Sequence, residues 1–99
     1  YVDDITRAAL AAATSDYAPG RVINVGTYQE TKIADLARKI NEITGNKAPI
    51  EFVPRRTWDQ TLRRVPNNQL AKTLLNFEVT VDFDEGLRRT YEWFKTIAG

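Results

Sequence analysis

Four arginines, one tryptophan and one aspartate lie between Pro54 and Arg64, directly after a short apolar run that ends at Val53. This stretch, which we call the basic loop, carries four positive charges and one negative charge, a net +3, whereas the whole chain carries +1. An arginine side chain can pair two phosphate oxygens and stays charged at any working pH. α/β proteins commonly hold anionic ligands beyond strand ends. The basic loop therefore indicates an anion site, and a solvated basic loop remains the alternative.

Other chemistry is limited by what the chain lacks. It contains no histidine and no cysteine. A hydrolase of the Ser-His-Asp or Cys-His type is therefore excluded, as are a disulfide framework and a thiolate metal site. We accordingly expect no metal-binding residues in this chain.

The bulk composition is that of one soluble globular domain. We expect the 99 residues to form a single domain over 1–99, since 42% are hydrophobic and 27% charged. No apolar run approaches a membrane span and no signal-peptide pattern opens the chain, so we expect a cytoplasmic location and no membrane partner. The chain begins at Tyr1 and contains no methionine, which is typical of a piece of a longer protein.

The first half of the chain has the pattern of a strand, a helix and a second strand. A helix is predicted over residues 5–13, where an alanine-rich stretch follows two aspartates. A β-branched run predicts a strand over residues 21–25. Apolar residues at helical spacing predict a helix over residues 33–43 that ends at Gly45, and a second strand over residues 50–53. These elements predict a right-handed βαβ unit with two parallel strands.

Two more helices are expected after the basic loop. Asn67 or Asn68 is predicted to cap a short helix through Leu75, with Asn76 as its left-handed stop. Asp82 and the glutamate three residues later predict a capping box at the start of a last amphipathic helix. The predicted fold class is α/β: a small two-stranded parallel core with flanking helices, which has too few strands for a whole Rossmann fold.

Six short patterns, in order and over nearly the whole chain, carry a resemblance to a known family. They are Tyr1-Val-Asp-Asp-Ile-Thr-Arg-Ala8, Ile23-Asn-Val-Gly-Thr27, Ile33-Ala-Asp-Leu-Ala37, Arg56-Thr-Trp-Asp59, the stretch from Asn67 to Phe77, and the stretch from Phe83 to Phe94. The chain resembles the C-terminal portion of extended short-chain dehydrogenase/reductases that act on nucleotide sugars. This group includes UDP-glucose 4-epimerase, dTDP-glucose 4,6-dehydratase and UDP-glucuronate decarboxylase. The resemblance implies the C-terminal segment of that fold, without its Rossmann half.

The resemblance also assigns roles within the basic loop. It implies that Arg56 pairs with the diphosphate of a UDP- or dTDP-linked sugar and that Asp59 accepts hydrogen bonds from the ribose hydroxyls. Arg55 and Arg64 are neighbouring candidates for substrate binding. Most family members have glycine directly before the aspartate, where this chain has Trp58. The indole would narrow the pocket or provide a stacking face.

The family's catalytic parts are not recognisable in this chain. The family binds NAD at a glycine-rich turn, but the five glycines here are scattered at positions 20, 26, 45, 86 and 99. Its Tyr-x-x-x-Lys spacing occurs at Tyr28/Lys32 and Tyr91/Lys95, which chance explains given four tyrosines and five lysines. We therefore expect no catalytic residues, no cofactor-binding residues and no NAD binding. Tyr91, Trp93 and Phe94 are instead predicted to pack in a core or an interface.

Three functions follow from these observations. The leading hypothesis is the substrate-binding segment of an NAD-dependent nucleotide-sugar epimerase or dehydratase, inactive without its NAD-binding half. The second is a stand-alone anion or nucleic-acid binding module that uses Arg55, Arg56, Trp58, Arg63 and Arg64, although a chain of near-neutral charge disfavours nucleic acid. The third is a purely structural oligomerisation piece. Since the helix over residues 5–13 is apolar nearly all around, we also expect the isolated chain to self-associate.

Overall fold

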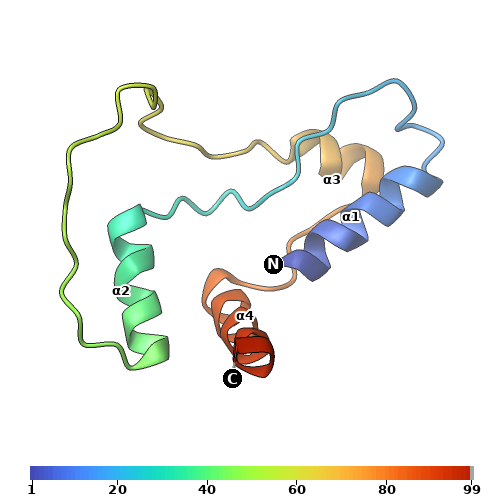
Figure 1. The fold of residues 1–99 in the computed structure, drawn as a ribbon. Helices are drawn as coiled ribbons and strands as arrows, with labels where there is room; N and C mark the ends of the chain where they lie inside the picture. Colours follow the sequence, from blue (N-terminus) through green and yellow to red (C-terminus); the bar gives the residue numbers. More distant parts are fainter. Residues whose placement is uncertain (99) are drawn as a thin grey trace.

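Four helices joined by long extended segments make up the computed structural model, which describes residues 1–98 (Figure 1). The helices are α1 (Val2–Thr14), α2 (Ile33–Thr44), α3 (Gln69–Leu75) and α4 (Phe83–Ala98). α1 packs against α3, and α2 packs against α4. One long segment carries the chain from α1 to α2, and the segment with the basic loop returns it to α3 (Figure 1).

The ends of α2 and α3 confirm the sequence predictions, and the start of α4 confirms them in part. Gly45 (φ +70°) and Asn76 (φ +51°) take the left-handed conformation that ends α2 and α3. After α3 the Phe77 amide donates to the Ala71 carbonyl at 3.3 Å, which closes the last turn. At α4 the Glu85 amide donates to Asp82 Oδ1 at 2.8 Å. The Glu85 carboxylate accepts from Arg89 at 2.9 Å, so only one arm of the predicted capping box is formed.

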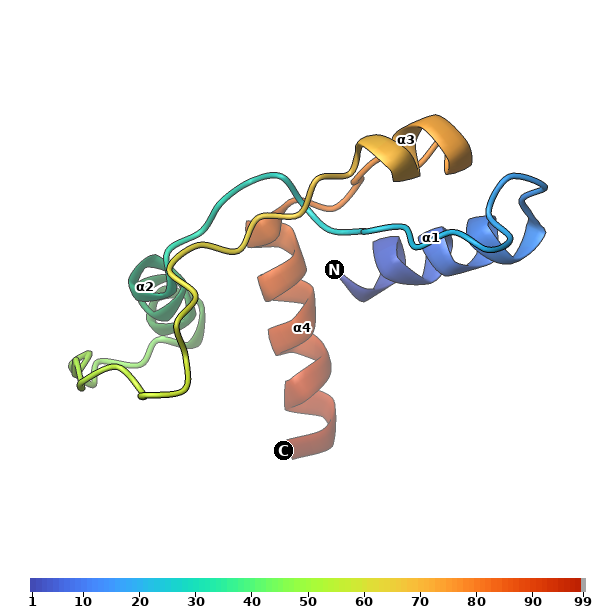
Figure 2. The same ribbon diagram turned by 90° about the horizontal axis from the view of Figure 1, so that it is seen from above.

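The predicted βαβ unit is not confirmed, because the described residues 1–98 form four helices and no strands. Residues 21–25 and 50–53 are extended, but neither segment is part of a sheet. The two segments run well apart in both views (Figures 1 and 2). A strand needs a neighbouring strand to pair its amide and carbonyl groups, so an apolar extended run alone does not make a sheet.

The chain buries little apolar surface of its own. Its core is Ala8, Ala71 and Phe77, with Ile23, Val25, Leu75 and Val79 packed around them. The radius of gyration is 16.7 Å, against about 13 Å for a compact domain of this length. Large apolar side chains such as Val22 and Phe52 remain exposed. No helix within residues 1–98 combines the length and the apolar character that crossing a bilayer requires.

A buried carboxylate joins α1 to the connection between α3 and α4. The Asp4 side chain accepts from the Thr80 hydroxyl at 2.7 Å, from the Val81 amide at 3.1 Å and from Arg7 at 2.7 Å. The Thr80 amide also donates to it, at 3.2 Å. Burial alone would raise the pKa of Asp4, but these hydrogen bonds outweigh it and hold the pKa well below its usual range. We call this contact the Asp4 junction.

A second junction ties the two long extended segments together. The Asn68 side chain accepts from the Gly26 amide at 3.0 Å and donates to the Gly26 carbonyl. Asn67, not Asn68, therefore supplies the local contact to α3, accepting from the Gln69 amide at 2.9 Å. Pro66 lies against Gly26, where a Cβ atom would come 2.5 Å from the Pro66 ring. Glycine is thus required for this close approach.

Candidate functional site

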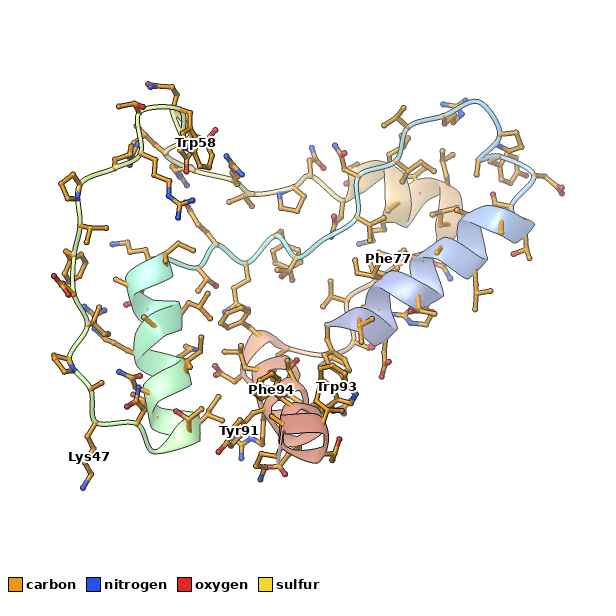
Figure 3. The ribbon with its side chains drawn as sticks, viewed as in Figure 1. Lys47, Trp58, Phe77, Tyr91, Trp93 and Phe94 are labelled. Carbon is orange, nitrogen blue, oxygen red and sulfur yellow. The ribbon has the colours of Figure 1, made fainter. Side chains whose placement is uncertain are left out.

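The basic loop forms a tight turn on the outside of the molecule, with Trp58 near its tip (Figure 3). The Asp59 amide donates to the Arg56 carbonyl at 3.1 Å, which brings the two residues to opposite ends of one turn. The Thr61 amide donates to Asp59 Oδ1 at 3.2 Å and orients the carboxylate. The turn therefore holds a cationic and an anionic side chain three residues apart.

Two of the four arginines in the basic loop are neutralised by carboxylates. Arg63 forms a two-pronged contact with Glu30, with both nitrogen–oxygen distances at 2.6 Å. This hydrogen bond lowers the pKa of Glu30 and raises that of Arg63. Arg64 pairs with Asp59 at 3.3 Å. The contact with Glu30 also fastens the basic loop to the extended segment before α2.

The other two arginines, Arg55 and Arg56, have exposed side chains and no carboxylate partner within residues 1–98. The Arg56 guanidinium lies over the indole of Trp58, 5.4 Å from the ring centroid. The indole itself is 71% exposed. The structure thus brings Arg56 and Asp59 together in one turn and pairs Arg64 with Asp59, whereas the Arg55 side chain beside them forms no hydrogen bond or ion pair within residues 1–98.

Glu30 is the member of this site that the sequence did not indicate. It lies 33 positions before Arg63 in the chain, between the predicted strand over residues 21–25 and the helix that starts at residue 33. A glutamate between two polar residues has no local signal that would name its partner. Its pairing with Arg63 is evident only from the structure, which places the basic loop beside the segment before α2.

Two hollows of the structure lie away from the basic loop. One, of about 550 Å³, is lined by Tyr28, Phe77 and Val79 together with Lys72 and other residues at the start of α3. The second, of about 530 Å³, lies on the side of α1, shares Tyr28, Phe77 and Val79, and includes Asp4. None of the four arginines lines either hollow. The basic loop is therefore an open surface, able to contact an anion but not to enclose it.

The two Tyr-x-x-x-Lys pairs lie in different surroundings. Tyr28 is 79% exposed. Lys95 lies 4.9 Å from the centre of the Tyr91 ring and pairs with Glu92 at 2.8 Å, and this contact raises the pKa of Lys95. Tyr91 is half-buried, whereas Trp93 and Phe94 are exposed on α4 (Figure 3), so neither contributes to a core here. In the described part of the chain no three acidic residues gather as a metal site.

Comparison with curated proteins finds relatives that act on nucleotide sugars. The chain is 33% identical over 95 residues to UDP-glucuronic acid decarboxylase 1 of Xenopus tropicalis. This match covers 96% of this chain and 22% of that protein. It is 28% identical over 102 residues to UDP-N-acetyl-alpha-D-glucosaminuronate decarboxylase of Bacillus cytotoxicus, covering 98% of this chain and 32% of the relative. No protein-family model matches the chain.

Solved structures give the same result at higher identity. The epimerase Mth375 of Methanothermobacter thermautotrophicus superimposes with a TM-score of 0.93 and 39% identity, over 96% of this chain and 28% of that protein. The enzyme WbmF of Bordetella bronchiseptica, solved in complex with NAD+ and UDP, gives a TM-score of 0.80 and 41% identity over 98% of this chain and 29% of WbmF. The chain thus spans less than a third of the length of each of these proteins.

Proposed function

The chain belongs to the nucleotide-sugar epimerase/dehydratase family of the extended short-chain dehydrogenase/reductases and corresponds to a C-terminal portion of such enzymes, and from this we infer that it is their substrate-binding segment. In this proposal the chain binds the nucleotide part of a UDP- or dTDP-sugar and is catalytically incomplete by itself. The remainder of an enzyme of this family would supply the chemistry.

The observation that carries the proposal is the turn that holds Arg56 and Asp59. A nucleotide diphosphate presents phosphate oxygens and, next to them, the ribose hydroxyls. A guanidinium without a carboxylate partner suits the first group, and a carboxylate suits the second as an acceptor. The turn places these two side chains three residues apart, with the Asp59 carboxylate oriented by the Thr61 amide and by Arg64. Arg55 adds a second unpaired cation beside them.

The pairing within the basic loop also weighs against the nucleic-acid alternative. Non-specific binding to nucleic acid depends on the number of phosphates that free lysines and arginines neutralise. Two of the four guanidinium groups are already matched by Glu30 and Asp59. Two adjacent cations fit a diphosphate better than a long phosphate backbone.

NAD, which the family implies, does not fit the residues of this chain. A dinucleotide site needs glycines close together at the start of a helix, so that the backbone can approach the pyrophosphate. Here Gly20, Gly26, Gly45 and Gly86 are far apart in sequence, and none precedes a helix in that arrangement. The proposed function therefore assigns no step to NAD within this chain.

A chimera provides the test. The segment of WbmF that this chain matches is replaced by the chain, and UDP binding is measured by calorimetry, since WbmF has been solved with UDP. Arg56→Ala should raise the dissociation constant for UDP about ten- to 150-fold, because a charge-assisted hydrogen bond contributes about 1.5–3 kcal/mol.

Arg88→Ala is the matched control, since Arg88 is an exposed arginine on α4 outside the basic loop. It should leave UDP affinity unchanged. An Arg56→Ala chimera that binds UDP as well as its parent would contradict the proposal. Binding of a single-stranded oligonucleotide by the chain alone, steeply weakened by salt, would favour the nucleic-acid module instead.

A further inference from the structure

The indole of Trp58 is the one large aromatic group of the basic loop, and its place there has no explanation in the packing of the molecule. It is 71% exposed, so it buries little apolar surface. The Arg56 guanidinium lies over its ring, 5.4 Å from the centroid. This distance is within the range in which the negative face of an indole attracts a cation.

The contact restricts the side chain that the proposed function needs most. A free arginine has many rotamers, and fixing them on ligand binding costs affinity. Arg63 and Arg64 are held by carboxylates, which also neutralise their charge. Arg56 is held by a ring instead, so its position is restrained while its charge stays available to an anion. Phosphate oxygens can approach the edge of the guanidinium while the ring occupies one of its faces.

We propose that Trp58 is a positioning residue that holds the Arg56 guanidinium ready for the phosphates of the ligand. The proposal rests on the proposed function, because it takes Arg56 as the phosphate contact. The proposal explains why a tryptophan directly precedes Asp59 in this chain. Direct stacking of Trp58 on the nucleobase is a different role, and the test separates the two.

The test uses the 99-residue chain and two probes, inorganic pyrophosphate and UDP, with binding followed by NMR. The chain has two tryptophans, so the indole signal of Trp93 on α4 serves as an internal reference for that of Trp58. Trp58→Leu should weaken binding of both probes by the same factor, about two- to fivefold, as expected for an exposed cation–ring contact. Trp58→Phe should restore most of the affinity, because it keeps an aromatic face.

A double-mutant cycle distinguishes positioning from a general effect on the loop. In an Arg56→Ala background, Trp58→Leu should cause no further loss, since the group that it positions is gone. An equal loss in both backgrounds would overturn the proposal. Weakened binding of UDP with unchanged binding of pyrophosphate would also overturn it, in favour of stacking on the base. If Arg56→Ala itself leaves pyrophosphate binding unchanged, the phosphate contact of the proposed function fails, which is a result distinct from failure of Trp58 alone.

Discussion

Replacing Asp4 with asparagine tests whether a single buried carboxylate holds α1 to the connection between α3 and α4. Asparagine keeps the shape of the side chain but removes its charge and turns one acceptor oxygen into a donor. Asp4 is 3% exposed. On one side of its carboxylate lie the amides of Thr80 and Val81, and on the other lie Arg7 and the Thr80 hydroxyl. Either orientation of the new amide group faces at least one donor.

The size of the effect follows from these contacts. A buried donor left without a partner costs about 1–3 kcal/mol. The lost ion pair with Arg7 adds less than about 1 kcal/mol, because the Arg7 side chain is 47% exposed and screened by water. We therefore expect Asp4→Asn to destabilise the junction by about 1–4 kcal/mol. Asp3→Asn is the matched control, since Asp3 is exposed in the same turn and contributes only about 0.3–1 kcal/mol through the helix dipole.

The same contact predicts a dependence on pH. The folded pKa of Asp4 lies below its unfolded value, which is about 3.9. Its contribution to stability is therefore fully present above about pH 4 and is lost as the pH falls toward the folded pKa. The difference between the native chain and Asp4→Asn should accordingly shrink as the pH is lowered from 4 to 3.

Hydrogen exchange at the Val81 amide is the direct measurement, because that amide donates to Asp4. Asp4→Asn should reduce its protection factor by about five- to 1000-fold at neutral pH, which corresponds to about 1–4 kcal/mol. Asp3→Asn should reduce it by less than about tenfold, and helical circular dichroism checks that α4 persists in both. Equal protection in the two variants would refute the assignment of the junction to Asp4.

Two further predictions concern the extended segments and the exposed apolar surface. Gly26→Ala should remove the exchange protection of the amide at position 26, because its Cβ would lie 2.5 Å from the Pro66 ring; unchanged protection would contradict the steric explanation. The isolated chain should self-associate, most simply as a two-fold dimer that covers Val2, Ile5 and Leu10 on α1. Sedimentation equilibrium at tens of micromolar decides this, and a clean monomer of about 11 kDa would show that α1 needs no partner.

The helices were predictable from sequence because their signals are local. Gly45 and Asn76 mark the ends of α2 and α3 because they tolerate positive φ. Asp82 marks the start of α4 because its side chain accepts a hydrogen bond from the amide three residues later. The first helix was also found, although it begins at Val2 and not at Ile5. In each case the residues that determine the element lie within one turn of it.

The strands and the tertiary contacts were not predictable in the same way. An extended run becomes a strand only when another strand pairs with it, and for residues 21–25 no such partner lies within residues 1–98. The two carboxylates that organise the structure, Asp4 and Glu30, meet partners 76 and 33 positions away. The sequence indicated Asp4 only as a favourable charge at the start of a helix. For the candidate site, the turn residues Arg56 and Asp59 were indicated by a resemblance, whereas the pairing that leaves Arg56 unmatched required the structure.

The Asp4 junction has a consequence for how freely the rest of the chain can vary. It joins residues that lie 76 positions apart in the sequence. The chain between them, which includes α2 and the basic loop, is therefore one long closed loop. The entropy lost in closing such a loop grows only with the logarithm of its length, and roughly ten additional residues would cost only about 0.1 kcal/mol. Insertions in the basic loop are therefore nearly without penalty for the junction. The basic loop can therefore change in length while the four donors around Asp4 stay unchanged.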